Sequence, residues 1–158
     1  MEYSPEVRVI AHIENDFSDK FGIPRQSGLA DNVSKIVFCK EFCRSEAVKG
    51  LEGFSHIWLL WCFSLAKGKS GLTVRPPRLG GNKRVGVFAT RSPYRPSKIG
   101  LSSVKIEKIE TEGADAPAIY VRGADLANGT PIIDIKPYIP YTDCHTDAIG
   151  GFAEEMKD

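Results

Sequence analysis

The sequence predicts a mainly β fold, an antiparallel barrel or sandwich with one short helix. Three observations support this prediction: apolar residues recur at strand spacing over short runs, turn residues separate these runs, and strands do not alternate with helices along the chain. The chain has 158 residues, 42% of them hydrophobic, which is enough for one domain with a buried core. We expect this domain over residues 1–147 and a short tail over residues 148–158.

Seven runs have strand character. The third run is apolar at nearly every position, which favours a central strand buried on both faces over the alternative of a short buried helix. The turn signals Gly80-Gly81-Asn82 and Asn128-Gly129 precede the fourth and the seventh run. The predicted strands are Val7–Ile13, Val33–Cys39, His56–Phe63, Arg84–Thr90, Val104–Glu107, Ile119–Arg122 and Ile132–Ile135.

Helical character is confined to Glu41–Lys49, and Gly50 and Gly53 follow it as a stop signal. The tail Ala148–Asp158 is rich in small and charged residues, so we expect it to fray. The sequence contains neither a GxGxxG fingerprint after a strand nor a GxxxxGK[ST] loop. These absences argue against a Rossmann cofactor domain and against a P-loop.

Composition and cysteine use predict a cytoplasmic protein. No apolar run approaches the roughly 18 residues that span a membrane, and the first residues lack the basic-then-apolar pattern of a signal peptide. The four cysteines form no CxxC pair, so we expect reduced thiols and no metal site.

The net charge of +1 conceals a strong asymmetry along the chain. Residues 53–106 hold ten basic side chains and no acidic one, whereas residues 107–158 have a net charge of −7. A field of this kind can attract a nucleic acid or a phosphorylated ligand, but the same cations can equally pair with the acidic third of the chain. The ten are Lys67, Lys69, Arg75, Arg78, Lys83, Arg84, Arg91, Arg95, Lys98 and Lys105.

Four polar segments carry more glycine, proline and charge than a barrel needs. In the third of them, Arg-Pro and Pro-Tyr-Arg-Pro steps fix the backbone and hold guanidinium groups in place for phosphates or carboxylates. In the fourth, Asp134 and Lys136 share one face of a strand, as a functional pair or as a surface ion pair of small value. For His56, in the second, the aromatic neighbours favour a hydrogen-bonded core position over a role as ligand or base. The segments are residues 20–26, 51–58, 75–102 and 123–143.

Taken together, these segments resemble the TrmO family, also described as TsaA-like or YaeB-like proteins, which are tRNA N6-threonylcarbamoyladenosine methyltransferases. The matching strings cover about 75 residues spread through nearly the whole chain, and RPPRLGGN and GTPIIDIKPYIPY are the most specific parts. The strings are KFGIPRQSGL (20–29), AVKGLEGFSHIWLL (47–60), VRPPRLGGNKRVGVFATRSPYRPSKIGLSSV (74–104) and DLANGTPIIDIKPYIPYTD (125–143).

The resemblance implies a β-barrel-like methyltransferase that uses S-adenosylmethionine (SAM), is unrelated to Rossmann methyltransferases, and works as a homodimer. It implies methylation at N6 of the threonylcarbamoylated adenosine beside the anticodon of threonine tRNAs. It also implies the cofactor contacts, which fall on Pro24, Arg25, Gln26, His56, Ile57, Arg91, Leu101, Asp125, Leu126, Ala127 and Asn128.

The chemistry of SAM allows specific roles for some of these residues. Arg25 or Arg91 can bind the carboxylate of SAM, and Asp125 can accept hydrogen bonds from the ribose hydroxyls or the adenine amine. Leu101 and Ile57 can flank a ring. Methyl transfer is an in-line displacement at carbon, so positioning can supply much of the acceleration.

The acceptor nitrogen needs help, because an acylated N6 is a poor nucleophile whose N–H is more acidic than that of plain adenosine. A base or polar group near N6 would therefore favour the reaction. Motif and charge make Asp134, Lys136 and Tyr138 the candidate catalytic residues.

The anticodon arm of tRNA is the expected macromolecular partner. Tyr94, Tyr138 or Tyr141 can stack on an unpaired base. The cations expected to bind its phosphates are Arg75, Arg78, Lys83, Arg84, Arg95 and Lys98.

The chain departs from the family pattern in two places. The family string R-P-N-P-I-G-L-S is here Arg95-Pro96-Ser97-Lys98 followed by Ile99, and a C-terminal domain that many bacterial members carry is absent from the sequence. Two alternatives therefore stand beside a tRNA methyltransferase: a methyltransferase of the same fold with another acceptor, and a non-catalytic module that binds SAM or nucleic acid.

Overall fold

The computed structural model describes residues 2–15, 32–76, 81 and 83–156, and it divides the chain into two compact units. The first unit, Met1–Ala66 with Lys98–Tyr138, contains a closed antiparallel barrel. The second unit, Lys67–Ser97 with Ile139–Asp158, contains a two-stranded sheet and short helices. The predicted mainly β fold is confirmed, and the barrel is the form it takes.

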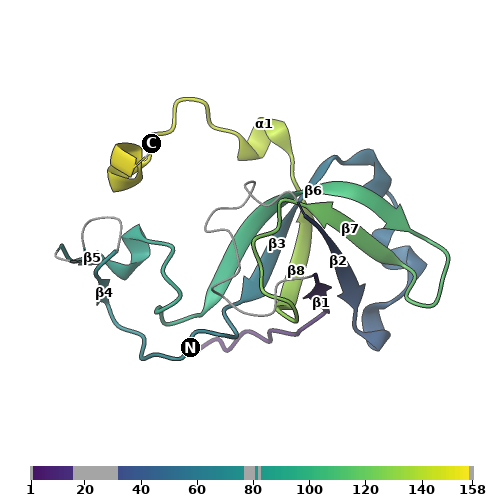
Figure 1. Cartoon of the computed structure of the whole chain (residues 1–158), viewed down its shortest axis with the longest axis horizontal. Coiled ribbons are helices and arrows are strands. Elements are labelled where there is room, and N and C mark those ends of the chain that lie inside the picture. Colours follow the sequence, from purple (N-terminus) through teal and green to yellow (C-terminus); the bar gives the residue numbers. More distant parts are fainter. Residues whose placement is uncertain (1, 16–31, 77–80, 82, 157–158) are drawn as a thin grey trace. The chain divides into compact units, whose positions relative to one another are not determined.

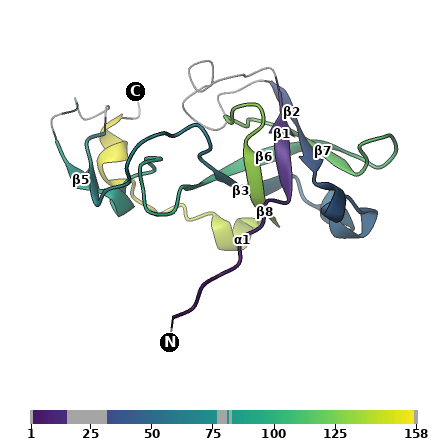
Figure 2. The ribbon, with the colours of Figure 1, turned by 90° about the horizontal axis from the view of Figure 1, so that it is seen from below.

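Six strands close the barrel, and each pairs antiparallel with both of its neighbours (Figures 1 and 2). The last strand in the chain returns to pair with the first, which removes all free edges. In order around the barrel, the strands are β1 (Ala11–Glu14), β2 (Val33–Phe38), β7 (Ala118–Arg122), β6 (Ile99–Glu110), β3 (His56–Cys62) and β8 (Pro131–Pro137).

Alternate side chains of these strands fill the barrel interior, as the two-residue period of a strand requires. On β3, Ile57 and Leu59 are completely buried, and Val104 of β6 and Ile132 of β8 meet them in the same core. The prediction that the third run is buried on both faces is wrong for the outer face. A barrel has only one interior, so the side chains at His56, Trp58 and Leu60 remain partly exposed.

Strand β6 is far longer than the predicted Val104–Glu107, because it serves two partners. Its first half pairs with β3 and its second half with β7, with a bulge between Ile106 and Lys108. Gly100 interrupts the apolar pattern at its start, yet the glycine is required there. A Cβ atom at residue 100 would lie 2.5 Å from Cζ2 of Trp61, whose indole covers this position.

Gly100→Ala is therefore expected to destabilise the barrel by about 1–3 kcal/mol, the usual cost of overpacking. Urea denaturation measures the change, with Gly53→Ala as the matched control, because a Cβ atom at residue 53 meets nothing within 4 Å. Equal stability of the two variants would contradict the close approach of indole and backbone.

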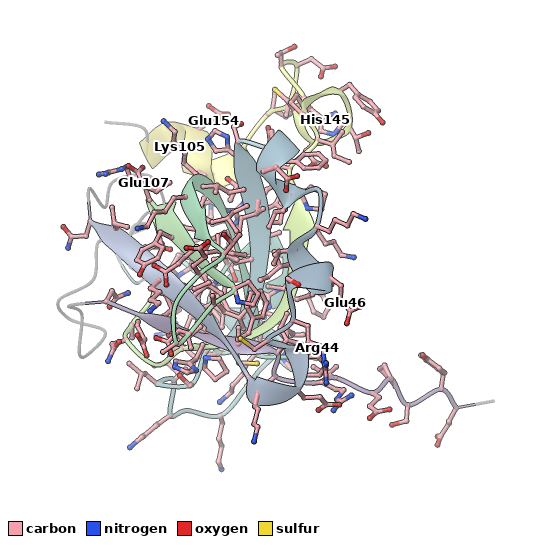
Figure 3. All side chains as sticks on the ribbon, turned by 90° about the vertical axis from the view of Figure 1, so that its right-hand side faces the viewer. Arg44, Glu46, Lys105, Glu107, His145 and Glu154 are labelled. Carbon is pink, nitrogen blue, oxygen red and sulfur yellow. The ribbon has the colours of Figure 1, made fainter. Side chains whose placement is uncertain are left out.

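The helical character predicted over Glu41–Lys49 is present as 3-10 turns, and a single continuous helix is not formed. Residues 40–53 form three separate 3-10 helices, Lys40–Phe42, Ser45–Val48 and Leu51–Gly53. Arg44 takes an extended conformation and Gly50 a left-handed one with φ of 90°, so the α-helical hydrogen bonds cannot continue. Arg44 and Glu46, which Figure 3 labels, lie on this segment.

In the second unit, β4 (Thr73–Val74) pairs with β5 (Val85–Gly86), and a 3-10 helix over Val87–Ala89 follows. The predicted strand Arg84–Thr90 is correct only at Val85–Gly86. The Val87 carbonyl accepts hydrogen bonds from both the backbone N–H and the hydroxyl of Thr90, which turns the chain. The remaining elements are α1 (Pro140–Asp143) and a 3-10 helix, Gly151–Met156, within the predicted tail.

Candidate functional site

Residues 123–130, the connection from β7 to β8, lie at one end of the barrel, and we call this end the Asp125 mouth. Ala124 and Leu126 of the connection are buried, which seats the backbone in the barrel opening. Asn15, after β1, donates its amide Nδ2 to the Leu126 carbonyl at 2.9 Å. Gly129 supports the turn into β8 with φ of 86°. The residue that follows β1 therefore holds the middle of the connection, and the Gly129 turn leads it into β8.

Asp125 is the one carboxylate within this connection, and inward-facing polar groups hold it. The Ser102 hydroxyl donates to its Oδ1 at 3.4 Å, and Nε1 of Trp61 donates to the Ser102 oxygen at 3.1 Å. Burial raises the pKa of Asp125, and hydrogen bonds from its own backbone N–H and from Ser102 act in the opposite direction. Among the described residues, no basic side chain pairs with this carboxylate.

The other predicted cofactor residues of the connection are placed differently. The side chains of Leu126 and Ala127 are buried, so a ligand would reach their backbone only. Asn128 is exposed, and its Oδ1 accepts a hydrogen bond from the Asn15 backbone N–H at 3.0 Å. Of the four, Asp125 offers the strongest acceptor.

His56 and Leu101 lie on the outer wall of the barrel and not inside the Asp125 mouth. Leu101, 44% exposed, directly precedes Ser102 but faces outward beside Leu60. Leu59 is the strand partner of Ser102, and His56 lies three residues before Leu59. His56 is therefore about 10 Å along β3 from the level of Ser102. Ile57 is completely buried in the core. Arg91 belongs to the second unit, and Pro24, Arg25 and Gln26 lie outside the described residues.

The candidate catalytic residues share the outer wall of β8 with aromatic neighbours. Nζ of Lys136 lies 3.4 Å from Oδ2 of Asp134, and the Ile135 backbone N–H donates to Oδ1 of Asp134. The ring centroid of Tyr138 lies 5.6 Å from that of Trp58 and 6.1 Å from that of His56. The wall thus places a half-exposed carboxylate, an ammonium group and a phenol on one strand end.

The family model of the tRNA-methyltransferase O N-terminal domain matches residues 12–144. The chain belongs to this family. The expected resemblance to TrmO is therefore confirmed, and it covers both the Asp125 mouth and the outer wall of β8.

Relatives of this TrmO domain are similar along nearly the whole chain. The putative S-adenosylmethionine-dependent methyltransferase RcsF of Pseudomonas aeruginosa is 44% identical over 153 residues, 96% of this chain and 62% of that protein. The tRNA (adenine(37)-N6)-methyltransferase of Escherichia coli is 41% identical over 147 residues, 92% of this chain and 62% of that protein. A crystal structure of TrmO from Pseudomonas aeruginosa has a TM-score of 0.78 at 39% identity, covering 96% of this chain and 63% of that one. The chain spans less than two thirds of the length of these relatives.

The predicted RNA-binding cations of the TrmO domain fall into two groups. Arg75, Lys83 and Arg84 are exposed, and Arg84 donates Nη1 to the Thr73 hydroxyl at 2.7 Å. Arg95 instead organises its own loop, with Nη1 at 2.8 Å from the Thr90 carbonyl. Two further carbonyls, of Val87 and Ser92, lie 3.4 Å from the same nitrogen.

Lys98 donates Nζ to the Ala66 carbonyl at 3.3 Å, so it too has a local role in the first unit. Arg78 lies outside the described residues.

Sequence reasoning missed Ser102 and Trp61, which the pairing of β3 with β6 brings together across 41 residues. Only the inward alternation of these strands could have indicated them. It also missed an apolar cavity of about 440 Å³ at the other end of the barrel, between the 3-10 helices and the strand ends. Phe38, Phe42 and Leu51 are among its lining residues, and no predicted site residue is.

The described part of the chain contains no group of three or more His, Cys, Asp or Glu side chains arranged to hold a metal ion. Within the same residues, no helix has the length and apolar character to cross a bilayer. All four cysteines are free thiols.

Proposed function

We propose that this TrmO domain binds SAM at the Asp125 mouth and transfers its methyl group to N6 of threonylcarbamoyladenosine beside the anticodon of threonine tRNA. The half-buried carboxylate of Asp125 carries this proposal, because it is desolvated without a cationic partner among the described residues. The printed activities of the relatives, a SAM-dependent methyltransferase and a tRNA (adenine(37)-N6)-methyltransferase, support the reaction class.

The donor set of the mouth fits SAM. The ribose diol and the adenine amine are hydrogen-bond donors, and a carboxylate that accepts from Ser102 retains further lone pairs for them. Asp125 and Asn128 would bind these groups with their side chains, and Leu126 and Ala127 with backbone atoms. Pro24, Arg25, Gln26 and Arg91 complete the proposed set, with an arginine binding the SAM carboxylate.

The outer-wall members of the set suggest that the ligand extends past the rim of the mouth. Leu101 and His56 both face outward, so they would contact a part of SAM that lies along this wall. Ile57 would contribute backbone atoms only, because its side chain lies in the core.

Bound SAM would supply a methyl group from its sulfonium, and the sulfur would remain on the cofactor as a neutral thioether. The protein's task is then to align N6 and to remove its proton. Asp134 can accept that proton, since its carboxylate is 47% exposed and is oriented by Lys136 and the Ile135 backbone N–H. Tyr138, packed against Trp58, can stack on or hydrogen-bond the substrate base.

A direct test combines binding and product analysis. Calorimetry with SAM at millimolar concentration is expected to show binding, and the absence of heat would overturn the proposal. Nucleoside mass spectrometry of tRNA from a deletion strain is expected to show loss of the methylated threonylcarbamoyl nucleoside. Unchanged tRNA with retained SAM binding would instead support another acceptor or a non-catalytic module.

Binding of the tRNA anticodon arm is expected to weaken steeply with salt, because basic side chains displace counterions from phosphates. Removing one exposed cation, in Arg75→Ala or Lys83→Ala, should reduce the slope of log K against log salt by about 1. Lys40→Ala is the matched control, an exposed lysine on a 3-10 helix outside the basic stretch. A flat salt dependence in the unmodified protein would show that the basic stretch does not bind RNA.

We also propose that the domain forms a homodimer in the cytoplasm. The outer face of β6 supports an interface, because Ile99 and Leu101 are 38% and 44% exposed there. Sedimentation velocity tests the dimer, and a monomer at micromolar concentration would contradict it. Cell fractionation tests the location.

A further inference from the structure

Two residues that face the barrel interior, Trp61 on β3 and Ser102 on β6, lead from the core to Asp125. Ser102 is 4% exposed, so its hydroxyl exchanges few hydrogen bonds with water. The hydroxyl oxygen lies 3.1 Å from Nε1 of Trp61 and 3.4 Å from Oδ1 of Asp125. Gly100 lies beneath the indole and leaves the space that this arrangement needs.

The direction of these hydrogen bonds follows from the chemistry of the three groups. An indole N–H can only donate, so the Ser102 oxygen accepts from Trp61. The single hydroxyl proton of Ser102 is then directed to the Asp125 carboxylate. A hydroxyl that already accepts a hydrogen bond donates more strongly, because neighbouring hydrogen bonds polarise one another.

We propose that Trp61 and Ser102 are positioning residues, which form a donor relay that orients Asp125 and keeps it ionised for the hydroxyl and amine donors of the cofactor. The inference rests on the proposed SAM site at the Asp125 mouth. Neither residue need touch SAM, since each acts through Asp125. Burial disfavours the ionised form of a carboxylate, and a hydrogen bond from the relay offsets this effect at Asp125.

The titration of Asp125 supports this role. Burial raises its pKa, while the hydrogen bond from Ser102 and the one from its own backbone N–H lower it. Within the described residues, no other charged or titratable side chain of β3, β6 or the 123–130 connection contributes to the shift. Ser102 is therefore the side chain whose removal should change the ionisation of Asp125.

The test is the pH dependence of SAM affinity in Ser102→Ala, measured by calorimetry between pH 5 and 8 together with the melting temperature. Loss of the donor raises the pKa of Asp125 further, so the pH below which affinity falls is expected to move upward. At neutral pH the affinity is expected to fall about tenfold. Trp61→Phe, which keeps a packed ring but loses the N–H, should shift the profile in the same direction by less.

Two further variants separate positioning from structure. Ser102→Thr restores the hydroxyl and is expected to return the pH profile toward that of the unmodified protein. Ser103→Ala, the next residue on β6, is the matched control and should leave the profile unchanged. A lower melting temperature in Ser102→Ala with an unshifted profile would overturn the relay.

The relay and the proposed function fail in different ways. If the unmodified protein binds no SAM, or if Asp125→Ala binds it normally, the proposed site is wrong. If SAM binds and Asp125 is required, but neither Ser102→Ala nor Trp61→Phe changes the profile, only the relay is wrong.

Discussion

Asp134→Ala is expected to lower kcat for tRNA methylation by about 10²–10⁴-fold, the range in which a positioned general base contributes. The affinity for SAM should change little, because Asp134 lies on the outer wall of β8 and its partner is Lys136. Single-turnover methylation at saturating SAM and tRNA measures the effect.

The matched control is Glu107→Ala. Glu107 is a similarly exposed carboxylate on β6, in an ion pair with Arg122 of β7, and Figure 3 labels it beside Lys105. The hydrogen bond from Arg122, helped by the charges of Arg122 and Lys105, lowers the pKa of Glu107, so it is a poor base. Similar rates for the two variants would leave Asp134 as a surface ion pair of small value.

Asp125→Asn is expected to change ligand binding and stability in opposite directions. Affinity for SAM should fall about 10- to 100-fold, since hydrogen bonds to a charged group contribute roughly 1.5–3 kcal/mol. Stability at neutral pH should rise, because the folded protein no longer buries a charge. Calorimetry and thermal melting measure the two effects on the same samples.

The pH dependence of that stability difference follows from the sign of the shift. The pKa of Asp125 is raised in the folded protein above its ordinary value of 3.8, so folding favours the protonated form. As the pH falls through the folded pKa toward 3.8, the unmodified protein gains stability relative to the unfolded chain. The advantage of Asp125→Asn should therefore shrink over this interval, and an advantage that is constant with pH would contradict the burial argument.

The strand pattern predicted most of the barrel, because a two-residue period reports directly on an inward and an outward face. It overextended the first strand, since Val7 and Val9 are apolar but exposed, and β1 is Ala11–Glu14. It missed the start of β6, because Gly100 has no apolar side chain although the barrel needs that gap for Trp61.

The candidate site was predictable only in part. Asp125 and Asp134 follow from family strings, but no local pattern predicts that Trp61 meets Ser102 or that Ser102 meets Asp125. These contacts depend on strand register over 41 and 23 residues, which is a property of the closed barrel. Arg95 shows the converse case, since its charge indicated RNA while its guanidinium contacts three backbone carbonyls.

The pairing of β8 with β1 has a consequence for biosynthesis. During translation the first strand emerges long before residues 131–137, so its open edge must wait for the last strand before the cylinder is complete. Ile132 pairs with both β3 and β1. A nascent chain that ends before Ile132 would therefore lack the β1–β8 pairing that closes the barrel. The ribosome must therefore deliver almost the entire first unit before the barrel can close, so the six-stranded core forms late in the synthesis of this unit.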